Sequence, residues 1–508
     1  MNSETSITLN TIRDMKEFYQ NMGLHDYPFN VYTAENEIQY ATEIFVHPYN
    51  YDAIKSSFDG NRSIVVRGNR GTGKTALLND LYQSTNENEC IKCVIDDYSE
   101  MPLTPATSDY YELLIQNLVA ALFYQLFSDK QRIRELDKEE RVFLSCLLSE
   151  YTSQPTKTEL KRKIEAIQLS GFARFIKRNF DLCRAILNFG ITAGLNVVND
   201  VIRNYFGVLP PIQESQIKDI IPKTALEADT EFNKSKATYN LLMKLCLTIK
   251  KLGYRRIVVF FDKFDEDSRM ENNAETISDF FTPLLTDNKL LENPNIQLVI
   301  SVWEVPFNRI LSQFRSQKHH CPLLSWPLTK LKDALNKRLF VFSNGAISSY
   351  RSLFADDVDD EKIAEIFELC NGNPRDLWHI FDLIIQEQYS IDPANGKLTV
   401  LAINRGLNNF VTSFNFYEYY PKKPKAKANT MDIYSYIKHL LKLDEVTFTK
   451  NQLSKAASTG SSTPNYVVGM EGIGLVTNTK EKLNGGVVYR INDPKIVYAM
   501  KNHLDISR

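Results

Sequence analysis

The sequence has few cysteines and no long hydrophobic run, and no secretory signal is recognisable in it. The stretch 185–201 comes nearest to a membrane span, which needs about 20 consecutive apolar residues, but polar residues break it. These are Asn188, Asn196, Asn199 and Asp200. The first ten residues, MNSETSITLN, lack the basic and apolar regions of a signal peptide. Seven scattered cysteines fit a reducing compartment. We therefore expect a cytoplasmic protein with no membrane partner.

Metal-ligand patterns are also sparse. Cys90 and Cys93 have the spacing of half a zinc site, but no second pair follows them. Residues three apart on a strand also face opposite sides of a sheet. His319, His320 and Cys321 lack an evident fourth ligand. We expect no metal at either place, and no nuclease or protease motif is recognisable.

The net charge of −2 hides an uneven distribution. Residues 422–508 contain 14 Lys and Arg against 7 Asp and Glu, a balance of +7 that leaves −9 on the rest of the chain. Four of these lysines lie in the Pro/Lys-rich segment PKKPKAKA, which predicts a linker. A basic C-terminal segment on an acidic body indicates a polyanionic partner.

The most informative stretch is 63–78, SIVVRGNRGTGKTALL. Its apolar residues 64–66 predict a short buried strand, and the apolar residues after the motif open a helix. Between them lies the Walker A pattern, which is specific when a strand precedes it and a helix follows. We expect nine residues to contact a nucleoside triphosphate: Gly68, Asn69, Arg70, Gly71, Thr72, Gly73, Lys74, Thr75 and Ala76.

Each residue type in this pattern has a chemical reason. The glycines let the backbone approach phosphate oxygens closely, and the N–H groups at the start of the helix attract an anion. Lys74 supplies a positive charge to the β- and γ-phosphates, and the Thr75 hydroxyl is a ligand for Mg²⁺. The sequence therefore predicts ATP and Mg²⁺ as cofactors.

A Walker B arrangement follows about 190 residues later. Residues 257–261, IVVFF, predict a buried strand, and Asp262 stands at its carboxyl end, where ligands of parallel sheets bind and where a carboxylate helps to hold Mg²⁺. Lys263 occupies the next position, which is usually acidic in such ATPases. Activation of the attacking water then falls to Asp265 or Glu266, with Glu266 slightly preferred, or hydrolysis is slow.

Further core strands are expected at 90–95, 296–302 and 323–326. The strand at 296–302 ends near Ser301, which could contact the γ-phosphate or the attacking water, and Trp303, which is a poor candidate. A helix is expected over 304–317.

Two arginines are candidates for contact with the γ-phosphate. Arg315, on the expected helix 304–317, either acts across a subunit interface on a neighbour's γ-phosphate or belongs to a solvated helix face. Arg375 follows the helix-breaking Gly372–Pro374 turn and so lies in the first turn of a new helix. A cation there opposes the helix dipole, which indicates an anionic partner, unless Arg375 is simply a surface residue.

The C-terminal residues 430–508 predict three helices followed by a hairpin with a turn at Asn484-Gly485-Gly486. Three helices and a hairpin are typical of a winged helix, whose second and third helices form the DNA-reading arrangement. The basic residues favour double-stranded DNA as the partner of 421–508. Winged helices also dock proteins, so a protein effector stays open.

The order of GNRGTGKTALL, IVVFFDKFDE, GNPRDL and a winged helix resembles the AAA+-like ATPases of the replication-initiator (origin-recognition) type. It also resembles related bacterial P-loop ATPases that are often found in mobile-element and antiphage-defence loci, to which YPFNVYTAE adds a likeness. The resemblance implies that Asp262 holds Mg²⁺, that Arg375 reaches the γ-phosphate from a lid, and that nucleotide drives homo-oligomer formation. Lys263 and Trp303 depart from the pattern and imply slow turnover.

We therefore expect an α/β fold with a P-loop NTPase core and parallel sheet, a large helical insertion, a helical lid and a C-terminal winged-helix domain. The expected divisions are an N-terminal strap 1–60, a core 61–325 with insertion 105–250, a lid 326–420, a basic linker 421–429 and the winged helix 430–508. The strap either packs on the core or folds over the adenine, and the insertion is either a partner surface or a layer covering the sheet. The expected function is a slow ATPase switch that controls oligomerisation and DNA or partner engagement, with antiphage defence as one setting. The alternative is a signalling scaffold whose winged helix docks a protein effector.

Overall fold

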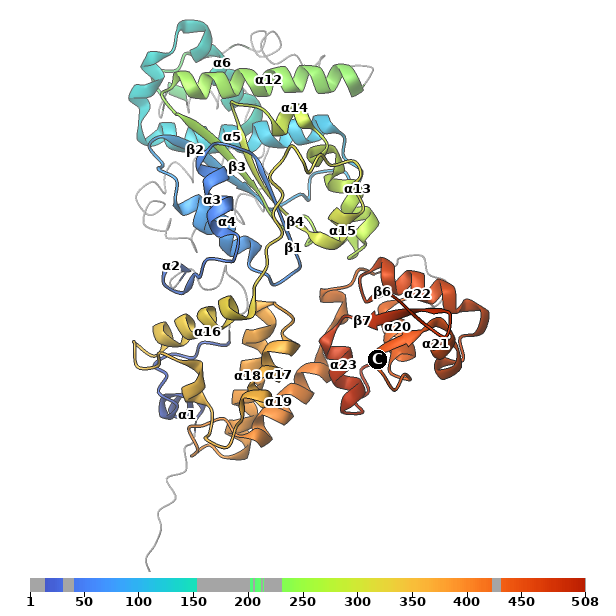
Figure 1. Cartoon of the computed structure of the whole chain (residues 1–508). Helices are drawn as coiled ribbons and strands as arrows, with labels where there is room; N and C mark the ends of the chain where they lie inside the picture. The colour runs from blue at the N-terminus through green and yellow to red at the C-terminus, as the bar shows by residue number, and fades with distance from the viewer. Residues whose placement is uncertain are drawn as a thin grey trace, which may run out of the picture.

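The computed structural model describes residues 14–30, 41–152, 202–203, 206–211, 213, 231–422 and 431–507. Parts of the expected strap, insertion and linker therefore lie outside the described residues. The described chain is a mixed α/β protein with a four-stranded parallel sheet, a three-stranded antiparallel sheet and many helices (Figure 1).

The parallel sheet has the strand order β1-β4-β3-β2. Its strands are β1 (Ile64–Gly68), β2 (Cys90–Ile95), β3 (Arg256–Phe261) and β4 (Gln297–Trp303). They are short, mostly apolar runs, as strands buried on both faces require. The prediction of these four strands is confirmed.

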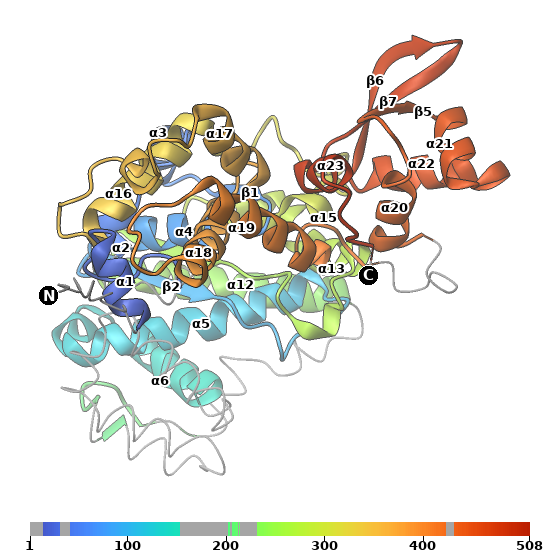
Figure 2. The ribbon, with the colours of Figure 1, turned by 90° about the horizontal axis from the view of Figure 1, so that it is seen from below.

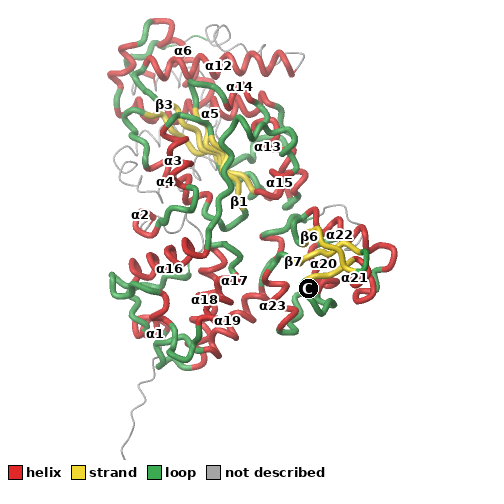
Figure 3. The backbone as a smooth tube through the Cα atoms, in the orientation of Figure 1, coloured by secondary structure: helices red, strands yellow, loops and turns green. Residues whose placement is uncertain are grey.

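Helices cover both faces of this sheet (Figure 3). Alternate residues of β1 point to opposite faces, so that Ile64 and Val66 join one hydrophobic cluster and Val65 joins the other. The first cluster includes α3 (Tyr51–Asp59) and α4 (Lys74–Gln83). The second includes α5 (Thr107–Ser128), α6 (Lys138–Thr152), α12 (Glu231–Lys251), α13 (Ala274–Leu285) and α14 (Asn288–Leu291). The described ends of the insertion are therefore helices that cover the sheet.

Two expected elements after β4 are wrong in part. The helix α15 spans only Glu304–Asn308, and turns replace the rest of the expected helix 304–317. The turns let Phe307 and Phe314 pack their rings together inside the core, with centroids 5.2 Å apart. The expected strand 323–326 is reduced to isolated bridges from His320 and Leu323 to β1, because the intervening Pro322 has no N–H to donate.

A helical unit follows the sheet. It contains α16 (Leu328–Phe342), α17 (Asp360–Leu369), α18 (Pro374–Ile391) and α19 (Val400–Ser413), and α1 (Met15–Asn21) and α2 (Ala41–Ile44) accompany it. Residues 14–30 pack on this unit rather than on the sheet. Phe29 stacks on Phe381 with centroids 5.3 Å apart, and the Tyr27 hydroxyl donates to Asp382 at 2.6 Å. The expected packing of the strap on the core therefore holds for α3 and not for α1.

The C-terminal unit contains the predicted three helices and hairpin, together with a short strand and a last helix that the sequence analysis missed. The elements are α20 (Ile433–Leu440), β5 (Thr447–Thr449), α21 (Lys450–Ala457), α22 (Thr463–Gly472), β6 (Val476–Leu483), β7 (Gly486–Ile491) and α23 (Pro494–Lys501). Asn484 and Gly485 form the hairpin turn with φ of 49° and 79°, as a type I′ turn requires. Figure 2 shows the hairpin projecting away from the rest of the chain.

The C-terminal unit shares one hydrophobic cluster with α16–α19, and α23 packs against α17 and α19. The short helix η5 (Phe416–Glu418) precedes the segment that joins the two units. Within the described residues, no helix is both long and apolar enough to span a bilayer.

Candidate functional site

The glycine loop, residues 69–73, runs from β1 into the first turn of α4. Gly71 and Gly73 have φ of 81° and 83°, a region that side chains with a Cβ rarely adopt. A Cβ on Gly71 would lie 2.5 Å from Oδ1 of Asn373 and 2.9 Å from Cβ of Arg375. Glycine is thus required both by the backbone and by the close approach of α18.

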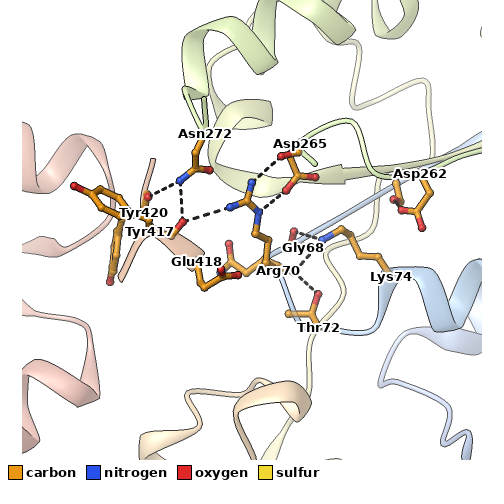
Figure 4. Close-up of polar contacts among 12 residues, drawn as sticks. Gly68, Arg70, Thr72, Lys74, Asp262, Asp265, Asn272, Tyr417, Glu418 and Tyr420 are labelled. Atoms are coloured by element: carbon orange, nitrogen blue, oxygen red, sulfur yellow. Dashed lines mark hydrogen bonds and ion pairs between the residues drawn. The ribbon is translucent and has the colours of Figure 1, made fainter. Parts of the chain in front are cut away.

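Lys74 begins α4 and turns back over the loop. Its Nζ donates to the carbonyl oxygens of Gly68 at 3.0 Å and Asn69 at 2.9 Å (Figure 4). Burial lowers the pKa of Lys74; nearby Asp265 and Asp262 raise it, and two arginines, Arg375 and Arg70, lower it. Four charged side chains from distant segments therefore act on this ammonium group.

Thr75 and Asp262 are in direct contact although 187 residues separate them. The Thr75 hydroxyl donates to Oδ2 of Asp262 at 2.7 Å, and the Ser301 hydroxyl donates to the other carboxylate oxygen. Asp262 is only 5% exposed, and this burial raises its pKa, while the hydrogen bonds from Ser301 and Thr75 lower it. The strand order explains the meeting, because β4 with Ser301 lies between β1 and β3.

The oxygen atoms of Thr75 and Asp262 fit Mg²⁺. This ion prefers oxygen ligands and is usually held by one or two carboxylates together with phosphates and water. In the part of the chain that the structure describes, no group of three or more His, Cys, Asp or Glu residues could hold a metal ion. A Mg²⁺ at Asp262 would therefore take most of its ligands from a bound nucleotide and water.

The two candidate bases lie in different surroundings. Asp265 is paired with Arg70, whose Nε donates to Oδ2 of Asp265 at 2.5 Å and whose Nη2 donates to its carbonyl oxygen at 2.9 Å. The side chain of Asp265 is 9% exposed, whereas Glu266 is exposed on the turn after β3. The Asp265 carboxylate is thus buried beside the glycine loop, and Glu266 faces solvent.

Lys263 has a strained backbone. Its φ of 60° is uncommon for a residue with a Cβ, and such strain is concentrated at functional sites. Its Nζ lies 3.8 Å from a carboxylate oxygen of Asp96, at the end of β2. A cation thus follows Asp262, at the position that is usually acidic in the ATPases that the motifs resemble.

Arg375 lies against the glycine loop, in the first turn of α18. Asn373 caps this helix by accepting from the Arg375 N–H at 3.0 Å, and the same N–H lies 3.4 Å from the carbonyl oxygen of Gly71. The guanidinium is 3.9 Å from a carboxylate oxygen of Glu418, and its buried Nε has no hydrogen-bond partner among the described residues. The expected anionic partner is therefore met in part by Glu418, and one donor remains for another anion.

Arg315 is not brought to this cluster. It is exposed in the turns after α15, and no contact among the described residues joins it to the glycine loop. A contact of Arg315 with the γ-phosphate of a second subunit therefore stays a prediction.

Two residues of the site were missed from the sequence. The Asn373 amide donates to the carbonyl oxygen of Arg70 at 2.6 Å, and the Trp326 indole donates to that of Thr72 at 2.8 Å. Asn373 had a recognisable signal, since asparagine before Pro374 is a favoured helix cap. No local pattern marks Trp326.

A cavity of about 400 Å³ is lined by the glycine loop and by the C-terminal unit. Its walls come from the loop (Asn69), α15 (Asn308), the turn before α18 (Asn371) and the C-terminal unit (Gly472 and Asn492). Three parts of the chain thus meet around the loop. No protein-family model matches the chain, and a comparison with curated proteins gives no significant match.

Proposed function

We propose that the chain is an ATP-binding, slowly hydrolysing switch with a P-loop core, a helical lid and a C-terminal winged helix, of the AAA+-like type that its motifs resemble. The contact of Thr75 with buried Asp262, beside Lys74, carries the proposal. It joins the two motifs that Mg²⁺-nucleotide binding needs, at the carboxyl ends of parallel strands.

Each residue has a task in this proposal. Lys74 leaves the loop carbonyls to bind the β- and γ-phosphates, whose charge replaces those weaker contacts. Thr75 and Asp262 hold Mg²⁺, which offsets the negative charge of the phosphates. Arg375 carries its unpaired Nε–H from α18 to the nucleotide, so that α16–α19 close on the core.

Slow hydrolysis follows from the charged residues at and after Asp262. Lys263 is a cation, Glu266 is exposed and Asp265 is bound by Arg70, so neither of the two candidate carboxylates is positioned to activate water. Bound ATP would therefore persist and act as a signal, and we propose that it drives assembly of several copies of the chain.

The output of the switch is duplex DNA or a protein effector, and one observation favours the protein. The helix α22, which would read DNA, has the sequence TPNYVVGMEG, with no basic residue and one acidic residue, and its Val468 is 62% exposed. Lys495, which contributes to the +7 balance, is fully buried. Phosphate contacts need exposed cations, so this surface suits a protein partner better than a phosphate backbone.

The direct test combines nucleotide binding with oligomeric mass. We expect the wild-type chain to bind Mg²⁺-ATP, to release phosphate slowly and to increase in mass on binding. Duplex DNA should leave the rate and the mass unchanged. DNA-stimulated hydrolysis would instead restore DNA as the partner, and a chain that binds no ATP would refute the proposal.

A further inference from the structure

Arg70 belongs to the glycine loop, yet its side chain turns away from Lys74 (Figure 4). Besides its two bonds to Asp265, its Nη1 donates to the carbonyl oxygen of Tyr417 at 3.3 Å, and its guanidinium lies 4.3 Å from the centre of the Trp303 ring. The side chain is 17% exposed. The guanidinium is thus held by the protein's own groups.

Tyr417 lies in residues 416–421, which lead from α19 towards the C-terminal unit. This segment, which is distinct from the N-terminal strap 1–60, is called the strap from here on. Asn272 of the core clamps this strap, since its Nδ2 donates to the carbonyl oxygens of Tyr417 at 2.8 Å and Tyr420 at 3.3 Å. The main-chain carbonyl oxygen of Asn272 accepts from the Lys422 N–H at 3.0 Å. Two hydrogen bonds therefore hold the strap to the segment that follows β3, and a third holds the next residue, Lys422.

The strap is equally fastened to the C-terminal unit. The Tyr417 hydroxyl donates to Asp432 at 2.8 Å, and the Tyr420 hydroxyl donates to buried Asp493 at 3.0 Å. A displacement of the C-terminal unit would pull on the strap and thereby on the carbonyl group that Arg70 binds.

Asp265 is the carboxylate that this arrangement withholds. Arg70, which binds it, belongs to the glycine loop, so this carboxylate lies beside the loop that would hold the phosphates. Its Oδ2 accepts from Arg70, which orients the carboxylate toward Arg70 rather than toward a water molecule at the γ-phosphate.

We infer that Arg70 and the strap form a brake on ATP hydrolysis, in which Arg70 keeps Asp265 from acting as the base until the C-terminal unit is displaced. The inference rests on the proposed function. In the released state the water oxygen bonds to the γ-phosphorus, the bond from that phosphorus to the bridging oxygen of ADP breaks, and one water proton goes to Asp265. Arg70 is thus a positioning residue, and the partner that binds the C-terminal unit sets the rate.

The test loosens the strap without touching the site. Asn272→Asp removes the amide donor and places a carboxylate against two carbonyl oxygens, while aspartate, like asparagine, tolerates the φ of 58° at this position. The loss of one or two hydrogen bonds should raise kcat about tenfold, with KM changed less than about twofold. Amide hydrogen exchange of residues 416–422 should become faster.

Asn117→Asp is the matched control, because Asn117 also donates to a main-chain carbonyl, that of Leu113 at 2.9 Å, but inside α5. It should change neither the rate nor the exchange of the strap. Adding Asp265→Asn to Asn272→Asp should remove the gain in kcat, whereas adding Glu266→Gln should not.

Three results would overturn the brake. One is an unchanged kcat in Asn272→Asp although the strap exchanges faster, another is unchanged exchange of the strap, and the third is a gain that Glu266→Gln removes and Asp265→Asn does not. A wild-type chain that binds no ATP would overturn the proposed function and the brake together, so the two failures are distinguishable.

Discussion

At the scale of single residues, the environment of Asp262 makes its ionised carboxylate unfavourable unless a cation binds beside it. Burial in the core raises its pKa, so the ionised form is disfavoured in the protein without ligand. The hydroxyl groups of Thr75 and Ser301 compensate this in part. Such a buried carboxylate is expected where function, rather than stability, selected the residue.

Replacing Asp262 by asparagine should therefore separate stability from binding. Because the folded-state pKa is raised, the protonated form is favoured by folding, and this stability is lost as pH rises through the folded pKa. Asp262→Asn keeps the neutral state and should stabilise the ligand-free chain at pH 7 by about 1 kcal/mol, with no gain at acidic pH. Mg²⁺-dependent ATP binding should be lost. Thermal unfolding between pH 4 and 8 measures this, and a lower melting temperature at neutral pH would contradict it.

The two candidate bases can be separated in the same way. Asp265→Asn should lower the slow turnover of the wild-type chain about tenfold or more. This loss is smaller than a freely positioned base would give, because Arg70 restrains Asp265. Glu266→Gln should leave it within about twofold, because Glu266 faces solvent. Single-turnover hydrolysis with prebound ATP compares them. A selective loss in Glu266→Gln would return the role to the residue that the sequence alone preferred.

The sequence predicted the groups that chemistry requires and missed the groups that only the fold brings together. Thr75 and Asp262 were expected to share one ion, because both motifs are local and each is tied to the end of a strand. The partners of Arg70 and Asn373 were not expected, since Arg70 meets Asp265 across 195 positions and Asn373 meets Arg70 across 303. Neither pair leaves a pattern in the sequence.

At the scale of elements, a buried ion pair joins the helical unit to the C-terminal unit. Lys495 of α23 is fully buried and lies 3.2 Å from a carboxylate oxygen of Asp376 in α18. Its ammonium is also 4.3 Å from the ring centre of Phe414 and 4.5 Å from that of Tyr419. Asp376 is next in sequence to Arg375, which packs against the glycine loop. The ion pair therefore lies close to the loop.

Breaking this pair from one side should be far worse than removing both charges. Lys495→Met leaves the buried carboxylates of Asp376 and Asp493 without their cation and should cost about 3–5 kcal/mol of unfolding free energy. Lys495→Met with Asp376→Leu should recover part of this cost, since Asp493 keeps its hydrogen bond from Tyr420. Urea unfolding of the two single variants and the double variant measures the coupling. Lys501→Met, at an exposed position of the same helix, is the control and should change stability by less than about 0.5 kcal/mol. Costs that simply add in the double variant would exclude the coupling.

Elements with a recognisable apolar pattern, as a run, an alternation or a helical stripe, were predicted well. The four strands of the parallel sheet and α5 are of this kind. The helix after β4 was overestimated because its apolar spacing continues beyond Asn308, while the chain leaves the helix to bury Phe314. The missed helix α23 did carry a start signal, since Asp493 caps it and Pro494 is its first residue.

At the scale of the whole molecule, the glycine loop lies where three units meet. The loop touches α18 through Asn373, the strap through Arg70 and, across the cavity, the C-terminal unit. We propose that this arrangement lets a nucleotide at the loop influence the distant surface of α22. No single motif predicts it, because it depends on how the units pack.

The surface of α22 predicts weak binding of duplex DNA. Affinity should already be low at 50 mM salt and should fall further by 200 mM, because α22 offers no basic side chain to the phosphates. Fluorescence anisotropy of a labelled duplex at several salt concentrations measures this, with and without ATP. Tight binding that persists at 200 mM salt would contradict the preference for a protein partner.

We propose above that Lys74, Thr75 and Asp262 form a Mg²⁺-ATP site. Calorimetric titration of Mg²⁺-ATP into the wild-type chain and into Lys74→Ala tests it most directly. We predict one nucleotide per chain for the wild type and a loss of at least about 100-fold in affinity for the variant, since about 2.7 kcal/mol is a modest value for a buried charge on phosphates. Equal affinity of the two proteins, or no binding to either, would contradict the account.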